Sequence, residues 1–241
     1  MISGMGPMPA LAGHAENDRS PTDQIMSLAD HPLQLILLLF ALSLLPLFIV
    51  MGTAFLKISI VLSTLRNALG IQQIPPNMAI YGLSLVLTLF IMAPVGIAIG
   101  DNLKANPIKM EAPDLFGQVE TRVLEPYREF IKGKASPQQV RFFMDIGEKM
   151  WPEPYRNRIP DDSLVVLIPA FTVSELVEAF KIGLLLYLPF VAIDLIVSNV
   201  LLAMGMMMVS PVTISLPIKL LVFVLIGGWE KLLGQLIQSY L

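Results

Sequence analysis

The chain has 241 residues, of which 55% are hydrophobic and 15% are charged, with a net charge of −3 and a mean hydropathy of +0.70. A soluble domain carries about 25% charged residues, so this composition indicates an integral membrane protein. The acidic balance argues against a nucleic-acid partner, and the absence of cysteine excludes disulfides, thiolate metal sites and cysteine nucleophiles.

The first 32 residues are polar, acidic and rich in proline and glycine, which predicts a flexible tail. This stretch lacks the basic and apolar regions of a secretory signal peptide. The two histidines of the chain, His14 and His31, both lie in it. Two scattered histidines make a weak metal site, so we expect neither a metal nor a cofactor.

Two charge-free runs follow, at residues 33–56 and 78–100. A helix needs about 20 apolar residues to cross the hydrocarbon core of a membrane, and both runs meet that length. Gly70 and the Pro-Pro-Asn segment at 75–77 predict a turn between them. We therefore expect a first helical hairpin over residues 33–100.

Residues 101–163 hold more than half of the charged residues of the chain. Prolines divide them into short pieces, at Pro126, Pro137, Pro152, Pro154 and Pro160. Apolar residues recur there at helical spacing, as at Val140, Phe143 and Gly147. The segment reads as a small, mostly helical polar insert. With about 60 residues it is marginal as an independent domain, so it needs neighbours to pack on.

Residues 164–241 are again apolar, with Ser210 and Pro211 interrupting them. Two glycines and Trp229 precede a short amphipathic C-terminal helix, whose apolar side carries Leu232, Leu233, Leu236, Ile237 and Tyr240. This predicts a second helical hairpin over 164–241. The expected fold class is an all-α membrane protein, built from two long helical hairpins and the small helical polar insert.

Prolines and glycines inside the apolar runs free backbone groups that lipid cannot satisfy. The residues concerned are Pro46, Gly52, Pro94, Gly96, Pro189 and Pro217. Either other helices cover these groups, which favours an assembly of several subunits, or the residues only kink ordinary spans. Lys57 and Arg66, with no acid between 57 and 77, favour a cytoplasmic loop there and place the insert outside.

Asp194 and Lys219 are the single charges of two long apolar runs. A charge at membrane depth faces a protein interior or a water-filled cavity. The two residues either line a pore or proton-linked site, or form a buried ion pair that sets helix register. Glu175 is a rival partner for Lys219, within one chain or between subunits.

Met204, Met206, Met207 and Met208 cluster just before the Ser210-Pro211 break. Methionine is flexible and fills irregular space without fixing one shape. Repeated around a ring of subunits, the cluster would form a deformable apolar collar; the alternative is ordinary lipid-facing or core methionine. No phosphate-binding loop, nucleophile elbow or HExxH motif occurs, so we expect no enzymatic activity.

Several ordered segments resemble the FliP/SctR family over residues 33–241. They include Leu65-Arg66-Asn67-Ala68-Leu69-Gly70, Pro75-Pro76-Asn77, Phe90-Ile91-Met92-Ala93-Pro94-Val95, Ser174-Glu175-Leu176, Ile193-Asp194-Leu195 and Leu216-Pro217-Ile218-Lys219-Leu220. The segment at 72–79 and the lack of a signal peptide look more like the injectisome branch than the flagellar branch of that family.

The resemblance implies a subunit of the type III secretion export gate in the bacterial inner membrane. It implies a homopentamer joined by FliQ/SctS-like and FliR/SctT-like subunits, projecting towards the periplasm and passing unfolded secreted proteins through a central pore. It further implies that Met206, Met207 and Met208 close the pore as a gasket, and that Glu175 and Lys219 make contacts between subunits. An ion or proton transporter that uses Asp194 is the alternative from another class of function.

Overall fold

The computed structural model describes residues 32–71, 74–106, 115–156, 160 and 162–241. The described part of the chain is helical and contains no strand, which confirms the all-α membrane fold class. The chain divides into two compact units, residues 1–46 and 47–241. The predicted tail at 1–31, with His14 and His31, lies outside the described residues.

The first apolar half forms helices α2 (Pro32–Gly52), α3 (Phe55–Leu69) and α4 (Asn77–Ala105). Helix α3 ends at Gly70, whose φ of 77° is a left-handed conformation that glycine adopts without strain. The expectation of a loop beginning at residue 57 is wrong, because the helix resumes at Phe55 and carries Lys57 in its first turn. Lys57 therefore no longer supports a cytoplasmic location for this connection. Arg66, in the last turn of α3, is the basic residue that still does.

Helix α2 runs through Pro46 and α4 through Pro94, so neither proline ends its helix. The break comes instead after Gly52, where the flanking helices are bent by 63°. The carbonyl groups freed there are covered by other elements, as predicted for an apolar segment. Tyr127 donates to Gly52 O at 2.8 Å, and the Thr172 hydroxyl lies 3.0 Å from Met51 O.

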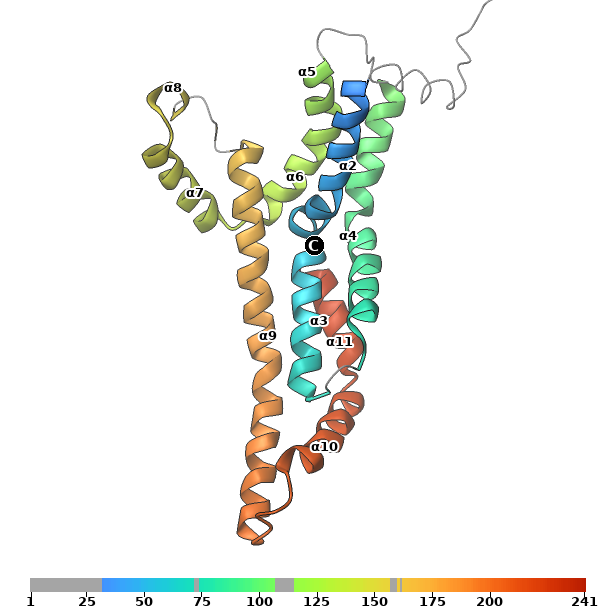
Figure 1. Cartoon of the computed structure of the whole chain (residues 1–241), viewed down its shortest axis with the longest axis vertical. Helices are drawn as coiled ribbons and strands as arrows, with labels where there is room; N and C mark the ends of the chain where they lie inside the picture. The colour runs from blue at the N-terminus through green and yellow to red at the C-terminus, as the bar shows by residue number, and fades with distance from the viewer. Residues whose placement is uncertain (1–31, 72–73, 107–114, 157–159, 161) are drawn as a thin grey trace, which may run out of the picture. The chain divides into compact units, whose positions relative to one another are not determined.

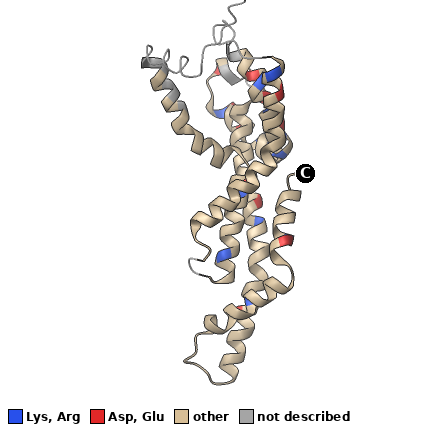
Figure 2. Cartoon of the chain, turned by 90° about the vertical axis from the view of Figure 1, so that its right-hand side faces the viewer, with Lys and Arg blue, Asp and Glu red and all other residues tan. Residues whose placement is uncertain are grey.

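The polar insert comprises α5 (Leu115–Val119), a π-helical turn η1 (Glu120–Leu124), α6 (Glu125–Lys134), α7 (Pro137–Met150) and α8 (Glu153–Arg156). Figure 2 shows that charged positions gather around these helices, whereas only isolated ones lie along the others. Ile131 and Ala135 are buried against the long helix that follows the insert, α9 (Leu164–Ala203). Their partners there are Leu167, Ala170 and Phe171. The expectation that the insert packs on neighbours is thus confirmed.

The second apolar half forms α9 (Leu164–Ala203), α10 (Pro211–Leu225) and α11 (Gly228–Gln238). Helix α9 has 40 residues and runs without interruption through Pro169 and Pro189. At a rise of about 1.5 Å per residue it is about 60 Å long, twice the thickness of a hydrocarbon core of about 30 Å. Figure 1 shows α3 lying between α9 and α4.

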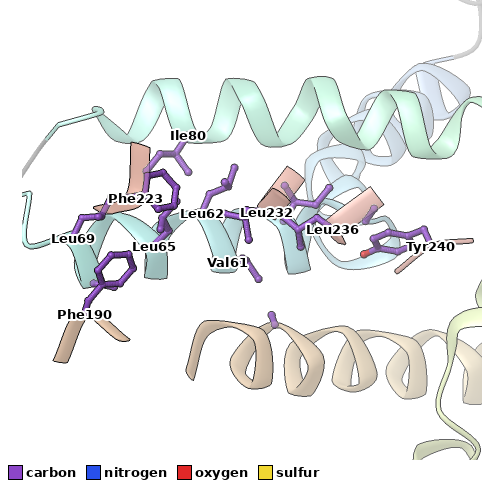
Figure 3. Close-up of a cluster of buried hydrophobic side chains, with 14 residues drawn as sticks. Val61, Leu62, Leu65, Leu69, Ile80, Phe190, Phe223, Leu232, Leu236 and Tyr240 are labelled. Atoms are coloured by element: carbon purple, nitrogen blue, oxygen red, sulfur yellow. The ribbon is translucent and has the colours of Figure 1, made fainter. Parts of the chain in front are cut away.

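A core of buried apolar side chains is organised around α3. Val61, Leu62 and Leu65 of α3 belong to one cluster with side chains of α4, α9, α10 and α11, as Figure 3 shows. The partners include Ile80 of α4, Phe190 of α9, Phe223 of α10, and Leu232, Leu236 and Tyr240 from the C-terminal segment. Helix α11 thus places its apolar face, with Leu232 and Leu236, in this core.

Among the described residues, α4 and α9 are each long and apolar enough to cross a membrane. Two bent pairs meet the same test only when each pair is taken together: residues 42–52 with α3, and α10 with α11, which is bent by 62°. The four apolar segments expected from the sequence thus correspond to two single helices and two broken ones. In the most apolar windows of α4 and α9, only 17% of the residues are buried.

Candidate functional site

The methionine cluster occupies the connection between α9 and α10. Helix α9 ends in two backbone hydrogen bonds, from Met206 N to Leu201 O at 2.9 Å and from Gly205 N to Leu202 O at 3.0 Å. This is a Schellman motif, which requires a left-handed residue at its penultimate position, and Gly205 has a φ of 72°. The motif turns the chain sharply, and Pro211 starts α10 only a few residues later.

The four methionines of this connection project away from the rest of the chain. Met204 is 59% exposed, Met206 44%, Met207 80%, and Met208 is fully exposed. Met207 and Met208 at the tip of the hairpin thus bury little apolar surface within their own chain. We define Met204, Met206, Met207 and Met208 as the methionine tip.

Asp194 and Lys219 face each other across α9 and α10. Lys219 Nζ donates to Asp194 Oδ2 at 2.6 Å and to Ala68 O of α3 at 3.3 Å. Lys219 is buried, whereas the Asp194 side chain is 38% exposed. The carboxylate oxygen Asp194 Oδ1 is nevertheless buried, and it accepts no hydrogen bond within the described part of the chain. This pair links three helices and leaves one acceptor unused.

Glu175 lies in a separate buried cluster and does not contact Lys219 within the chain. Lys57 Nζ of α3 lies 3.2 Å from Glu175 Oε1 and 2.8 Å from Glu178 Oε2, both on α9. The Tyr240 hydroxyl donates to Glu175 Oε2, and its ring lies 3.9 Å from Lys57 Nζ, within cation–π range. We call Lys57, Glu175, Glu178 and Tyr240 the lysine cluster.

The sequence indicates Glu175 as a site residue, but not the other three members of the lysine cluster, Lys57, Glu178 and Tyr240. Lys57 was assigned to a loop because it ends a charge-free run, although it also lies near the middle of the bent pair. Tyr240 was assigned only to the apolar face of the C-terminal helix. The signal for Tyr240 was its position four residues after Leu236, because a buried tyrosine hydroxyl needs a polar partner.

Neither the lysine cluster nor the pair of Asp194 and Lys219 has the composition of a catalytic or metal centre. No group of three or more histidine or acidic side chains is placed to hold a metal ion among the described residues. Both clusters are ion pairs with hydrogen-bond partners that join helices distant in sequence. Their chemistry fits the fixing of helix positions, whereas the methionine tip offers an apolar surface.

Comparison with known proteins identifies relatives along almost the whole chain. The model of the FliP family matches residues 38–236. Virulence protein YscR of Salmonella typhimurium is 56% identical over 216 residues, covering 89% of this chain and 100% of the relative. Yop proteins translocation protein R of Yersinia pestis is 54% identical over 208 residues, covering 86% and 96%. Harpin secretion protein HrcR of Erwinia amylovora is 46% identical over 210 residues, covering 87% and 97%.

Proposed function

Because the chain belongs to the FliP family, we propose that it is a core subunit of a type III protein secretion export gate. Together with copies of itself and FliQ/SctS-like and FliR/SctT-like subunits, it forms the pore through which unfolded proteins leave the cytoplasm. Relatives named for virulence, Yop translocation and harpin secretion support the injectisome branch over the flagellar one. The subunit belongs to the bacterial inner membrane, and its assembled gate projects towards the periplasm.

The methionine tip is the observation that carries this proposal. A rigid Schellman turn holds the end of α9, while four flexible apolar side chains extend beyond it. A ring of such tips makes a seal that excludes water and ions because it has no polar group to hydrate them. Methionine side chains rearrange at low cost, so the seal yields to an extended polypeptide of any sequence.

The length and surface of α9 support an assembly. A helix of about 60 Å cannot lie upright within a hydrocarbon core of about 30 Å. Lys181 is exposed in the middle of this helix and forms no ion pair with any described residue. A charge at that place in an apolar helix favours a protein or water partner supplied from outside the chain.

The stoichiometry is tested by measuring the mass of the intact complex. The chain is co-expressed with the neighbouring membrane subunits of its gene cluster, purified in mild detergent and analysed by native mass spectrometry. The proposal expects five copies of this chain together with the small partner subunits. A monomer or dimer that carries no partner would reject the pentameric gate.

The seal is tested by replacing Met206, Met207 and Met208 together with serine in the same complex. We expect the complex to keep its mass while cells expressing it become permeable to small ions, because hydroxyl groups hydrate the constriction. The matched control replaces Leu184, Leu185 and Leu188, which are also exposed but lie on α9, with serine. An intact complex with unchanged ion permeability in the methionine variant contradicts the seal.

A further inference from the structure

Two adjoining hollows lie where α3 ends and α4 begins, and they differ in chemistry. One, of about 490 Å³, is lined mainly by apolar side chains, among them Leu65, Leu83 and Phe223. The other, of about 580 Å³, is lined by polar and apolar groups in similar measure, and its polar side chains include Asn67 and Asn77. Arg66 and Ile71 line both hollows, so the two adjoin at these side chains. Each volume lies in the range of about 300–1,000 Å³ that is usual for small-molecule sites.

Arg66 has unused capacity to bind an anion. Its Nη1 donates to Asn77 Oδ1 at 2.6 Å and to Pro75 O at 3.3 Å, and both acceptors are neutral. No carboxylate of a described residue pairs with it. A guanidinium carries its donors in a planar fork that suits a phosphate, so the donors of Nη2 and Nε remain available for such a group.

Trp229 lines the apolar hollow together with Arg66. The Trp229 ring packs edge-on against Phe223, with 5.5 Å between ring centroids, and the side chain is 42% exposed. Tryptophan is enriched at the level of lipid headgroups, and arginine extends its charge to the same level. The shared hollow thus has the pattern of a membrane interface, with an apolar side below the headgroups and a polar side among them.

We propose that the two hollows bind one anionic phospholipid, with its phosphate at Arg66 and an acyl chain in the apolar hollow. Charge complementarity decides the class of ligand. A cation with only neutral partners, at the junction of a polar and an apolar hollow, matches an amphiphile that carries a net negative charge. The proposal is independent of the channel role, because the lipid is counted on the purified complex whatever that complex transports.

The test measures lipid retention by the full chain in its native complex. The complex is stripped of lipid in detergent and titrated with phosphatidylglycerol or phosphatidylcholine, and bound lipids are counted by native mass spectrometry. We expect preference for phosphatidylglycerol, and a loss of about tenfold in its affinity for Arg66→Gln, as for one charge-assisted hydrogen bond. Lys181→Gln, which removes an exposed cation elsewhere, is the matched control and keeps the preference.

A second variant separates lipid binding from the role of Arg66 in the turn. Ala79 is exposed and lines the apolar hollow, so Ala79→Trp fills the hollow without touching Arg66. We expect it to lose bound lipid, whereas Val86→Trp, on the same helix but outside the hollow, retains it. Equal affinity for both lipids, or full retention by Ala79→Trp, overturns the proposal. So does a photo-crosslinker at position 79 that captures a protein chain instead of lipid.

Discussion

Lys57 Nζ lies 3.2 Å from Glu175 Oε1, and both side chains are only 1% exposed. The two residues come from α3 and α9, the pair of helices that forms the centre of the second unit. Two charges in such a place are stable only when they neutralise each other and fill their hydrogen bonds. The Tyr240 hydroxyl completes the shell of Glu175, so the C-terminal segment is tied to the same point.

We predict that Lys57→Met destabilises the purified complex by about 3–5 kcal/mol, because it leaves the Glu175 carboxylate buried without a counter-charge. Thermal unfolding in detergent measures the change. Lys57→Met combined with Glu175→Gln should recover most of the loss, because no buried charge then remains. Lys104→Met is the matched control: Lys104 pairs with Asp101 at 3.7 Å on the surface, where such pairs contribute about 0–1 kcal/mol.

The ion pair between Asp194 and Lys219 leads to a second prediction. Asp194→Asn and Lys219→Met should each reduce the amount of assembled complex, because each leaves one charged partner alone at membrane depth. The charge swap Asp194→Lys with Lys219→Asp should restore assembly, because Lys219 Nζ and Asp194 Oδ2 lie 2.6 Å apart within one chain. Blue native electrophoresis of membrane extracts measures the assembled fraction.

Two other outcomes of that experiment carry distinct meanings. If the swap Glu175→Lys with Lys219→Glu restores assembly instead, Lys219 leaves Asp194 and pairs with Glu175 of another copy in the gate. If Asp194→Asn assembles normally but loses coupled proton flux, the transporter function replaces the channel. A carboxylate held by a buried ammonium is poorly suited to bind and release cations, so we do not expect the loss of proton flux.

Tyr127 provides a third prediction, concerning the break between α2 and α3. Burial raises the pKa of Tyr127 from 10.0 to about 12, so its hydroxyl remains protonated and donates to Gly52 O at ordinary pH. Tyr127→Phe should cost about 1–3 kcal/mol of stability, because the Gly52 carbonyl loses its partner. Tyr81→Phe, on the exposed side of α4, is the control and should change little.

The pH dependence of this effect has a defined sign. The pKa of Tyr127 is higher in the folded state, so its contribution is complete below about pH 10 and is lost as the pH rises towards 12. Unfolding curves of the parent complex should therefore shift to lower temperature over that window. The Tyr127→Phe variant should lack this part of the shift, and an identical shift in both would contradict the assignment.

The helices could be predicted from the sequence because transfer of charge-free segments into an apolar medium leaves little choice of structure. The sequence names Gly52 among several candidate positions for a kink but does not single it out. The helices continue through Pro46 and Pro94, and the chain breaks after Gly52. The methionine tip and Asp194 stood out by composition alone. The pairing of Lys57 with Glu175 depends on the packing of α3 against α9, which no local pattern specifies.

The final prediction concerns Gly205, which sets the direction of the methionine tip. A β-branched residue at a φ of 72° is strained by about 1–2 kcal/mol, so Gly205→Val should unwind the Schellman turn and displace Met206 and Met208. Gly205→Asn, which tolerates this conformation better, should have a weaker effect, and Gly82→Val, in open space on α4, should have none. The readouts are ion leakage and export of a reporter substrate. Because the turn sets only the direction of the side chains, we expect the Gly205→Val complex to assemble at normal mass yet to leak ions. Unchanged ion leakage and export in Gly205→Val would show that the methionines seal without a fixed turn.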